Sequence, residues 1–310
     1  MNDRKALDAR ASGLMVVLCM IWGLQQVILK MAAPDISPIM QIGLRSGLAA
    51  ILVLPLLYRE KNRQLLARPY LRSGLLVAFF FAFEFFLLAE AIRHTYASHT
   101  VVLLYTAPIF VALGLHWKLP AERLSALQWL GIAIAFGGII FTFIRPQSVH
   151  EIGANSILWG DCLALMAAIA WAATTISIRL TPLSQAPATQ TMFYQMFGGF
   201  VLLMIAAWTT GQTEIHWSKL TIGSLAFHTF VVSFASFLVW FWLLRTYLAS
   251  RLGVFSFLTP IFGMGFGVYF LDEKLEINFV LGTALVLIGV IVVSLPGWIQ
   301  SRRIKICRYR

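Results

Sequence analysis

The feature that most constrains this chain is a series of ten apolar stretches, each long enough to cross a lipid bilayer. A helix of about 20 apolar residues spans the hydrocarbon core of a membrane. The connections between the stretches are short, so the sequence predicts an all-α integral membrane protein of ten transmembrane helices without a soluble domain. The stretches cover residues 12–31, 38–57, 73–92, 97–117, 125–144, 156–178, 187–208, 221–244, 252–271 and 277–297.

Composition excludes a soluble globular protein. Hydrophobic residues make up 59% of the 310 residues and charged residues only 12%, and the mean hydropathy is +0.81. Too few polar residues remain to cover the surface of a soluble protein of this size, so the lipid bilayer is the expected solvent. Cys19, Cys162 and Cys307 have no motif spacing. We therefore expect no disulfide framework, no metal site and no cofactor.

The net charge of +11 is explained by topology and not by a nucleic-acid partner. Most of the 24 lysines and arginines lie in connections that share one side of the membrane when the N-terminus is inside, and the tail from Arg302 to Arg310 is strongly basic. Cytoplasmic connections of membrane proteins carry an excess of such residues. The sequence thus predicts a multi-pass protein of the inner (plasma) membrane with both termini in the cytoplasm.

The two halves of the chain repeat one pattern at an offset of roughly 150 residues. A proline, an acidic residue followed by a basic one, and two glycines recur in order as Pro108, Glu122, Arg123, Gly131 and Gly138, and again as Pro260, Glu273, Lys274, Gly282 and Gly289. An odd number of helices in each copy makes the second copy face the opposite way. We expect two inverted five-helix repeats, residues 1–150 and residues 151–310 with the basic tail, an arrangement typical of secondary transporters.

The chain resembles the EamA-type transporters of the drug/metabolite transporter superfamily over nearly its whole length. The resemblance rests on the order of several short motifs, which are Trp22-Gly23 followed by Lys30, Arg45, Pro108 with AERLS at 121–125, Gly160-Asp161, and PIF followed by DEKL at 260–275. It implies a ten-helix bundle that exports or exchanges small organic molecules, such as amino acids, other metabolites or drug-like cations. A fold alone does not name the cargo.

Arg45 and Glu84 are the strongest candidates for a substrate site. Ionisable residues inside a membrane are costly, about 2.5 to 3.5 kcal/mol at a helix centre, and need a partner or an aqueous cavity. Both residues are expected at a similar depth in the membrane. They serve either as contacts for substrate or as a structural ion pair. Phenylalanines surround Glu84 in the run FFFAFEFF. They favour a neutral carboxyl group, which makes Glu84 the candidate for coupling to protons, although most of these rings are expected to face lipid.

Further candidates combine hydrogen-bonding groups with aromatic rings, which suits an amphipathic ligand. The alternative role is to hold helices together. The predicted substrate-binding residues beside Arg45 and Glu84 are Trp22, Gln25 and Gln26 in the first stretch, Tyr105 in the fourth, Trp171 and Thr175 in the sixth, and Tyr194 and Gln195 in the seventh. Asp161 is expected to cap the sixth helix, with lining of the outer end of the cavity as the alternative, and His99 and His228 are weaker candidates.

Motifs of intramembrane enzymes, nucleotide loops and channel filters do not occur in the sequence. We therefore expect a carrier and not an enzyme, one that exports small organic metabolites, amino acids or related amphipathic or drug-like compounds, by alternating access. Its expected partners are a small-molecule substrate, the lipid bilayer and protons. Uptake or exchange of a similar solute is the alternative, and an intramembrane enzyme is the competing class.

Overall fold

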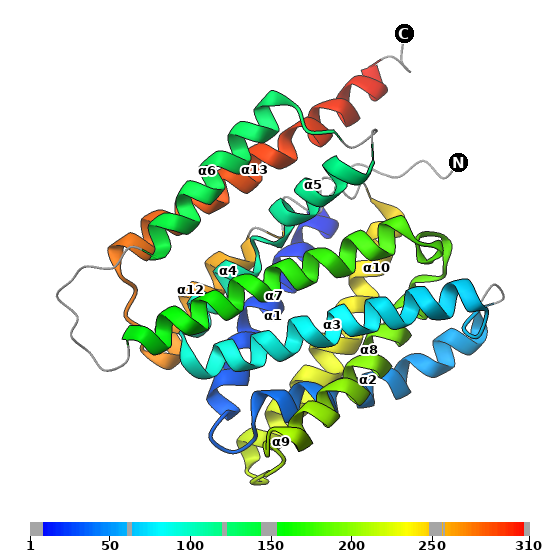
Figure 1. Cartoon of the computed structure of the whole chain (residues 1–310), viewed down its shortest axis with the longest axis vertical. Coiled ribbons are helices and arrows are strands. Elements are labelled where there is room, and N and C mark those ends of the chain that lie inside the picture. The colour runs from blue at the N-terminus through cyan, green and yellow to red at the C-terminus, as the bar shows by residue number, and fades with distance from the viewer. Residues whose placement is uncertain are drawn as a thin grey trace.

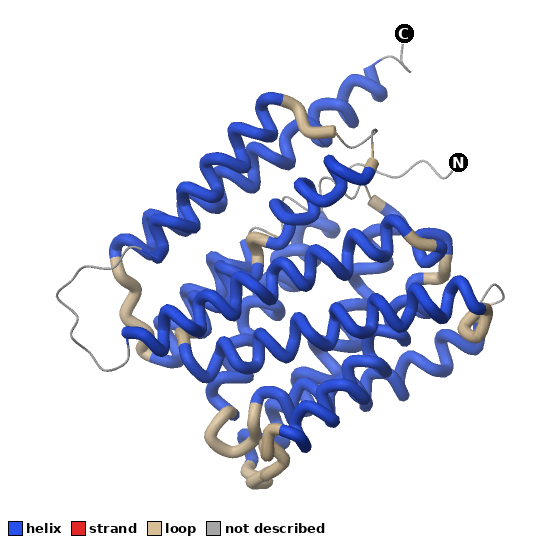
Figure 2. The backbone as a smooth tube through the Cα atoms, viewed as in Figure 1, coloured by secondary structure: helices blue, strands red, loops and turns tan. Residues whose placement is uncertain are grey.

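The computed structural model describes residues 9–60, 64–119, 123–143, 154–247, 256 and 258–306. Within these residues the chain is helical and its helices are joined by short loops (Figures 1 and 2). Among the described residues, seven helical segments are long and apolar enough to cross a membrane, with Ala97–Lys118 and Lys219–Trp240 each counted as one, and three shorter apolar helices accompany them. The predicted all-helical membrane fold is therefore confirmed.

The first half of the chain forms the helices of the first five apolar stretches. Their bounds are α1 Ala9–Ala32, α2 Pro38–Arg59, α3 Arg68–His94, α4 Ala97–Leu104, α5 Ala107–Lys118 and α6 Ala126–Phe143. The fourth stretch is divided into α4 and α5, because Pro108 lies in the first turn of α5 and cannot continue the hydrogen bonding of α4. The regular helix is therefore interrupted just before Pro108.

The second half of the chain forms the remaining stretches. Their bounds are α7 Ala154–Leu180, the short 3-10 turn η2 Pro182–Gln185, α8 Ala188–Thr209, α9 Lys219–Ala226, η3 Phe227–Ser236, α10 Phe237–Thr246, α12 Leu258–Leu271 and α13 Ile277–Ile306. The segment η3 is a π-helix between α9 and α10, and such segments are frequent at functional sites. The first residues predicted for the ninth stretch lie outside the described residues.

The contacts between helices are symmetric between the two halves of the chain. Equivalent helices pack on each other, namely α2 on α8, α4 on α12 and α6 on α13. The contact of α3 with α7 corresponds to the contact of η3 with α1. Exchanging the halves leaves this set of contacts unchanged. Such a pattern is that of a pseudo-two-fold axis, as expected for two structural repeats.

The glycines of the repeat show that the equivalent helices α6 and α13 run in opposite directions. A Cβ atom at Gly131 would lie 2.8 Å from the carbonyl oxygen of Gly289, and one at Gly138 would lie 2.7 Å from that of Gly282. The earlier glycine of one helix therefore meets the later glycine of the other. Figure 1 shows the two helices side by side at one edge of the molecule, and their close approach is what small residues permit.

Candidate functional site

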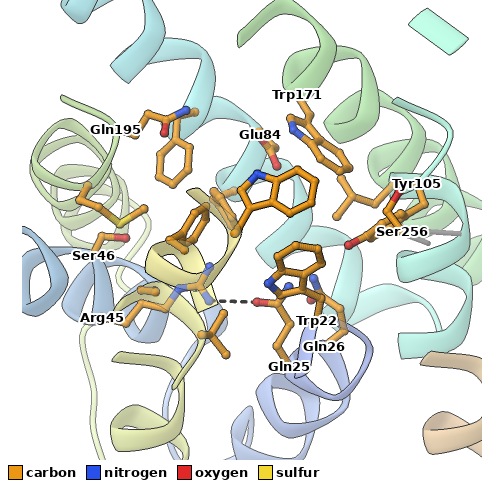
Figure 3. Close-up of a pocket in the computed structure, with 18 of the residues that line it drawn as sticks. Trp22, Gln25, Gln26, Arg45, Ser46, Glu84, Tyr105, Trp171, Gln195 and Ser256 are labelled. Carbon is orange, nitrogen blue, oxygen red and sulfur yellow. Dashed lines mark hydrogen bonds between the residues drawn. The ribbon is translucent and has the colours of Figure 1, made fainter. Parts of the chain in front are cut away.

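A cavity of about 330 Å³ lies between the two halves, and its lining residues come from α1, α2, α3, α5, α7, α8, η3 and α10, among others (Figure 3). This volume lies within the range of small-molecule sites. Most of the lining is aromatic or apolar. The polar side chains that line it are Gln25, Gln26, Arg45, Ser46, Glu84, Gln195, Ser233 and Ser256.

Arg45 projects from α2 into this cavity and is 5% exposed. Its Nη1 donates to Oε1 of Gln25 on α1 at 3.3 Å (Figure 3), and its guanidinium carbon lies 4.9 Å from the centre of the Phe85 ring. The Nε atom has no partner among the described residues. A planar cation held in this way keeps donors free for a carboxylate.

Glu84 projects from α3 and is also 5% exposed. In the described part of the chain its carboxyl group takes part in no hydrogen bond or ion pair, although the charge of Arg45 acts on it. Burial of an unpaired carboxylate is unfavourable, so the neutral form or a cationic ligand is favoured here. Arg45 and Glu84 are therefore separate groups on one cavity and do not form the structural ion pair considered from sequence.

The phenylalanines around Glu84 divide between two faces of α3. Phe81 and Phe85 line the cavity, whereas Phe79 is 52% and Phe83 is 39% exposed on the outside of the protein. Only these two of the six rings are exposed, so the expectation that most of them face lipid was wrong. Two of the rings therefore line the same cavity as Glu84.

Two tryptophans at equivalent positions of the repeats lie on the cavity. Trp22 donates its indole N–H to Oγ of Ser236 at 3.0 Å and meets the Trp240 ring edge to face at 5.6 Å. Trp171 meets the Tyr105 ring in the same manner at 5.5 Å. These contacts hold the rings in fixed orientations, with their apolar surface available to a ligand.

Gln26 and Gln195 complete the predicted residues that lie on the cavity. Gln26 is buried, and its Oε1 has no hydrogen-bond partner within the described ranges. A buried amide oxygen without a partner carries a desolvation cost that a ligand donor would remove. Gln26 therefore favours a ligand with an N–H or O–H group.

Two predicted site residues do not line the cavity. The hydroxyl group of Tyr194 donates to the carbonyl oxygen of Leu65 at 2.6 Å, and its ring packs against Gly74. Neighbouring residues on a helix point about 100° apart, so Tyr194 and Gln195 cannot share one narrow face. Thr175 donates to the carbonyl oxygen of Trp171, one turn earlier in its own helix.

A polar network behind the cavity was not predicted from sequence. His228 Nε2 lies 3.0 Å from the carbonyl oxygen of Gln25, and its Nδ1 lies 3.2 Å from Nε2 of Gln41, which also donates to Ser224. The network fixes the backbone of Gln25, whose side chain accepts from Arg45. Although His228 was a weaker candidate from sequence, its partners Gln25 and Gln41 lie far away in the chain, and nothing local indicated them.

Asp161, which was expected to cap the sixth helix, lies within α7 and not at its start. The helix begins at Ala154, so the expectation of a cap was wrong. The carboxylate of Asp161 instead accepts from the Thr95 hydroxyl group and lies 3.0 Å from Nδ1 of His99 on α4. Neither Asp161 nor His99 lines the cavity.

The EamA-like transporter family matches residues 10–144 and 158–295, which is most of the chain. The chain belongs to this family. It therefore contains two EamA domains and is a multi-pass membrane transporter, not an enzyme. The two matched segments correspond to the two halves related by helix contacts.

Named relatives cover nearly the whole chain. The Bacillus subtilis (strain 168) protein named "Uncharacterized transporter YoaV" is 24% identical over 89% of this chain and 93% of its own. The Escherichia coli (strain K12) protein named "Probable amino-acid metabolite efflux pump" is 28% identical over 92% of this chain and 95% of its own. Another protein of that strain, "Uncharacterized inner membrane transporter YedA", is 23% identical over 93% of this chain and 91% of its own.

A crystal structure has the same fold at low sequence identity. It superposes with a TM-score of 0.62 and 14% sequence identity, covering 92% of this chain and 98% of the other. This likeness concerns the arrangement of the helices alone.

Proposed function

We propose that this protein exports small amphipathic metabolites, amino acids or related compounds, from the cell by alternating access. The observation that carries the proposal is the presence of Arg45 and an unpaired Glu84 on one cavity lined by aromatic rings. A zwitterion with an apolar side chain complements all three features. Its carboxylate binds Arg45, its ammonium group faces Glu84, and its side chain packs on Trp22 or Trp171.

The relatives support this choice of cargo. Two of them carry the name "Probable amino-acid metabolite efflux pump", and the cavity of about 330 Å³ is large enough for an amino acid. The sequence carries no nucleotide-binding motif. We therefore assign the driving force to a gradient, with Glu84 as the group that exchanges a proton against the substrate.

Orientation follows from the charge distribution. The positive-inside rule places both termini in the cytoplasm of a cell with an inner (plasma) membrane, and residues 1–150 and 151–310 then form the two inverted repeats. In this orientation α4 begins and α12 ends at the outer surface. A reporter fused after Arg310 is expected to behave as cytoplasmic, and an external signal would overturn the assignment.

The function is tested with purified protein in liposomes. The liposomes are loaded with labelled amino acids or lipophilic cations in turn, and efflux is measured with and without an imposed pH gradient. We expect saturable efflux of an apolar or aromatic amino acid that is inhibited by the same unlabelled compound. Transport of cations alone would contradict an amino-acid substrate, and flux of amino acids only in the uptake direction would favour the uptake alternative.

A further inference from the structure

Two adjacent glutamines on α1 differ in what their side chains bind. Oε1 of Gln25 accepts from Nη1 of Arg45 at 3.3 Å. Gln26 lines the same cavity (Figure 3) and is 2% exposed, but its Oε1 has no hydrogen-bond partner among the described residues. The sequence left open whether Gln26 binds a ligand or holds helices together. A role between helices requires a partner on another helix, so the structure favours the ligand.

Contacts of its neighbours keep Gln26 on the cavity. Trp22, one turn earlier on the same face of α1, also lines the cavity and donates its indole N–H to η3. Gly23 packs so closely on α12 that a Cβ atom would lie 2.8 Å from a backbone nitrogen of that helix. The carbonyl oxygen of Gln25 lies 3.0 Å from Nε2 of His228. These contacts with η3 and α12 fix the rotation of α1 and with it the direction of Gln26.

Two buried polar atoms of opposite kind on this cavity lack partners in the described part of the chain. Oε1 of Gln26 is an acceptor, and Nε of Arg45 is a donor. A ligand that fills the cavity displaces water from both atoms, and each then needs a hydrogen bond from the ligand to offset its desolvation. The matching ligand has a carboxylate for Arg45. Because Glu84 on the same cavity favours a cation, the donor for Gln26 is an ammonium N–H group.

Charge and aromatic rings alone do not select such a donor. The rings of Trp22, Trp171 and Trp240 line the cavity, and aromatic rings bind quaternary ammonium ions by cation–π attraction. The carboxyl group of Glu84 attracts any cation, with or without N–H groups. A site built to hydrogen-bond an N–H group rejects a ligand that lacks one, because a buried polar atom then stays unpaired. Gln26 therefore decides between cations that donate hydrogen bonds and cations that do not.

We propose that Gln26 selects the substrate by its N–H groups. Its Oε1 accepts a hydrogen bond from the ammonium group of the substrate, so the protein binds primary, secondary and tertiary amines and excludes quaternary ammonium compounds. The inference rests on the proposed function for its choice of an amino acid as substrate. It adds that drug-like cations with a quaternary nitrogen are not cargo of this transporter.

Binding is measured with a series of ligands that changes the number of N–H groups but not the charge of the ammonium group. Labelled phenylalanine is bound to the purified protein in lipid nanodiscs and displaced by unlabelled phenylalanine or its N-methyl, N,N-dimethyl and N,N,N-trimethyl derivatives. Only the trimethyl derivative has no N–H group. For wild type we expect the dissociation constant to rise by about 5- to 150-fold at the third methyl group, the cost of leaving a buried acceptor unpaired.

Gln26→Met separates the hydrogen bond from the shape of the site. Methionine has a similar length but only a weak acceptor, so the step at the third methyl group should disappear. The variant should bind the dimethyl derivative more weakly than wild type does, and the trimethyl derivative as tightly or more tightly. Equal weakening of both derivatives, as a folding defect would cause, would overturn the proposal. An even rise over the three methyl groups in wild type would overturn it too.

Gln41→Met is the matched control. Gln41 is also buried in a helix, and its Oε1 also lacks a partner within the described ranges, but it does not line the cavity. This variant should keep the step at the third methyl group. Loss of the step in Gln41→Met would contradict direct contact between Gln26 and the ammonium group as its origin.

A second series of ligands keeps this inference separate from the proposed function. Labelled 2-phenylethylamine and its methylated derivatives lack the carboxylate and should show the same step at lower affinity. Efflux of phenylalanine from liposomes is measured with the same protein. Absence of efflux with a step in the amine series would reject amino-acid export and leave selection by Gln26 standing. Efflux without a step in either series would do the reverse, and absence of binding in both series would overturn the inference.

Discussion

Arg45 donates to Gln25 at 3.3 Å and forms no ion pair with Glu84, although both ionisable groups line the same cavity. The arrangement leaves a cation and an acid available at separate points of one cavity. An ion pair between them would have satisfied both groups permanently. Their separation is what a substrate with charges at two points requires.

Arg45→Ala should weaken substrate binding more than it alters the fold. A charge-assisted hydrogen bond contributes about 1.5 to 3 kcal/mol, so the half-saturating concentration of a transported amino acid should rise by about 10- to 100-fold. Arg45→Lys keeps the charge but not the planar fork and should lie between wild type and Arg45→Ala. The measurement is the concentration dependence of efflux from liposomes, and equal affinities in the three proteins would remove Arg45 from the binding site.

Glu84→Gln should weaken substrate binding and abolish proton coupling. The amide is a permanent neutral mimic of the protonated carboxyl group, which does not hold the ammonium group in the proposed exchange, so both substrate affinity and efflux driven by a pH gradient should fall. Glu90→Gln is the matched control, because Glu90 lies on the same helix and pairs with Arg93 near the surface. Gradient-driven efflux at the wild-type rate in Glu84→Gln would assign proton coupling to another group.

Tyr194 and Gln195 offer a comparison of neighbouring residues. Tyr194→Phe removes the hydrogen bond to Leu65 and should lower the free energy of unfolding by about 1 kcal/mol without changing substrate affinity. Gln195→Leu should change affinity or selectivity, because Gln195 lines the cavity. Thermal unfolding and efflux kinetics of both variants test this division, and a change of affinity in Tyr194→Phe alone would reverse it.

Hydrophobic length and the repeated motifs were enough to predict the helices and the correspondence between the two halves. The predicted second stretch, 38–57, corresponds to α2 Pro38–Arg59, and the division near Pro108 follows from the chemistry of proline alone. By contrast, α13 continues to Ile306, beyond the predicted end at 297. A helix that leaves the bilayer loses the apolar signal on which the prediction rests.

The cavity was predicted less completely. A sequence indicates how deep in the membrane a residue lies, but not how its helix is rotated about its own axis. Arg45 and Glu84 were placed at similar depth, and both reach the cavity. Tyr194 and Gln195 are neighbours and lie at nearly the same depth in the membrane, so only the rotation of α8 decides which of them lines the cavity. Asp161 shows the same limitation, since its partner His99 lies on a different helix and no local pattern connects them.

Gly131→Ala tests the antiparallel contact of α6 and α13. Its Cβ would lie 2.8 Å from the carbonyl oxygen of Gly289 and 2.9 Å from the backbone nitrogen of Val293, so the two helices must move apart, at a cost of about 1 to 3 kcal/mol. Gly137→Ala is the matched control on the same helix, because its Cβ would meet nothing within 4 Å, and alanine favours a helix over glycine by about 0.5 to 1 kcal/mol. Thermal unfolding followed by size-exclusion chromatography should therefore show a lower midpoint for Gly131→Ala and an unchanged or higher one for Gly137→Ala. Equal midpoints in the two variants would mean that α6 and α13 do not approach as closely as the glycine pairs require.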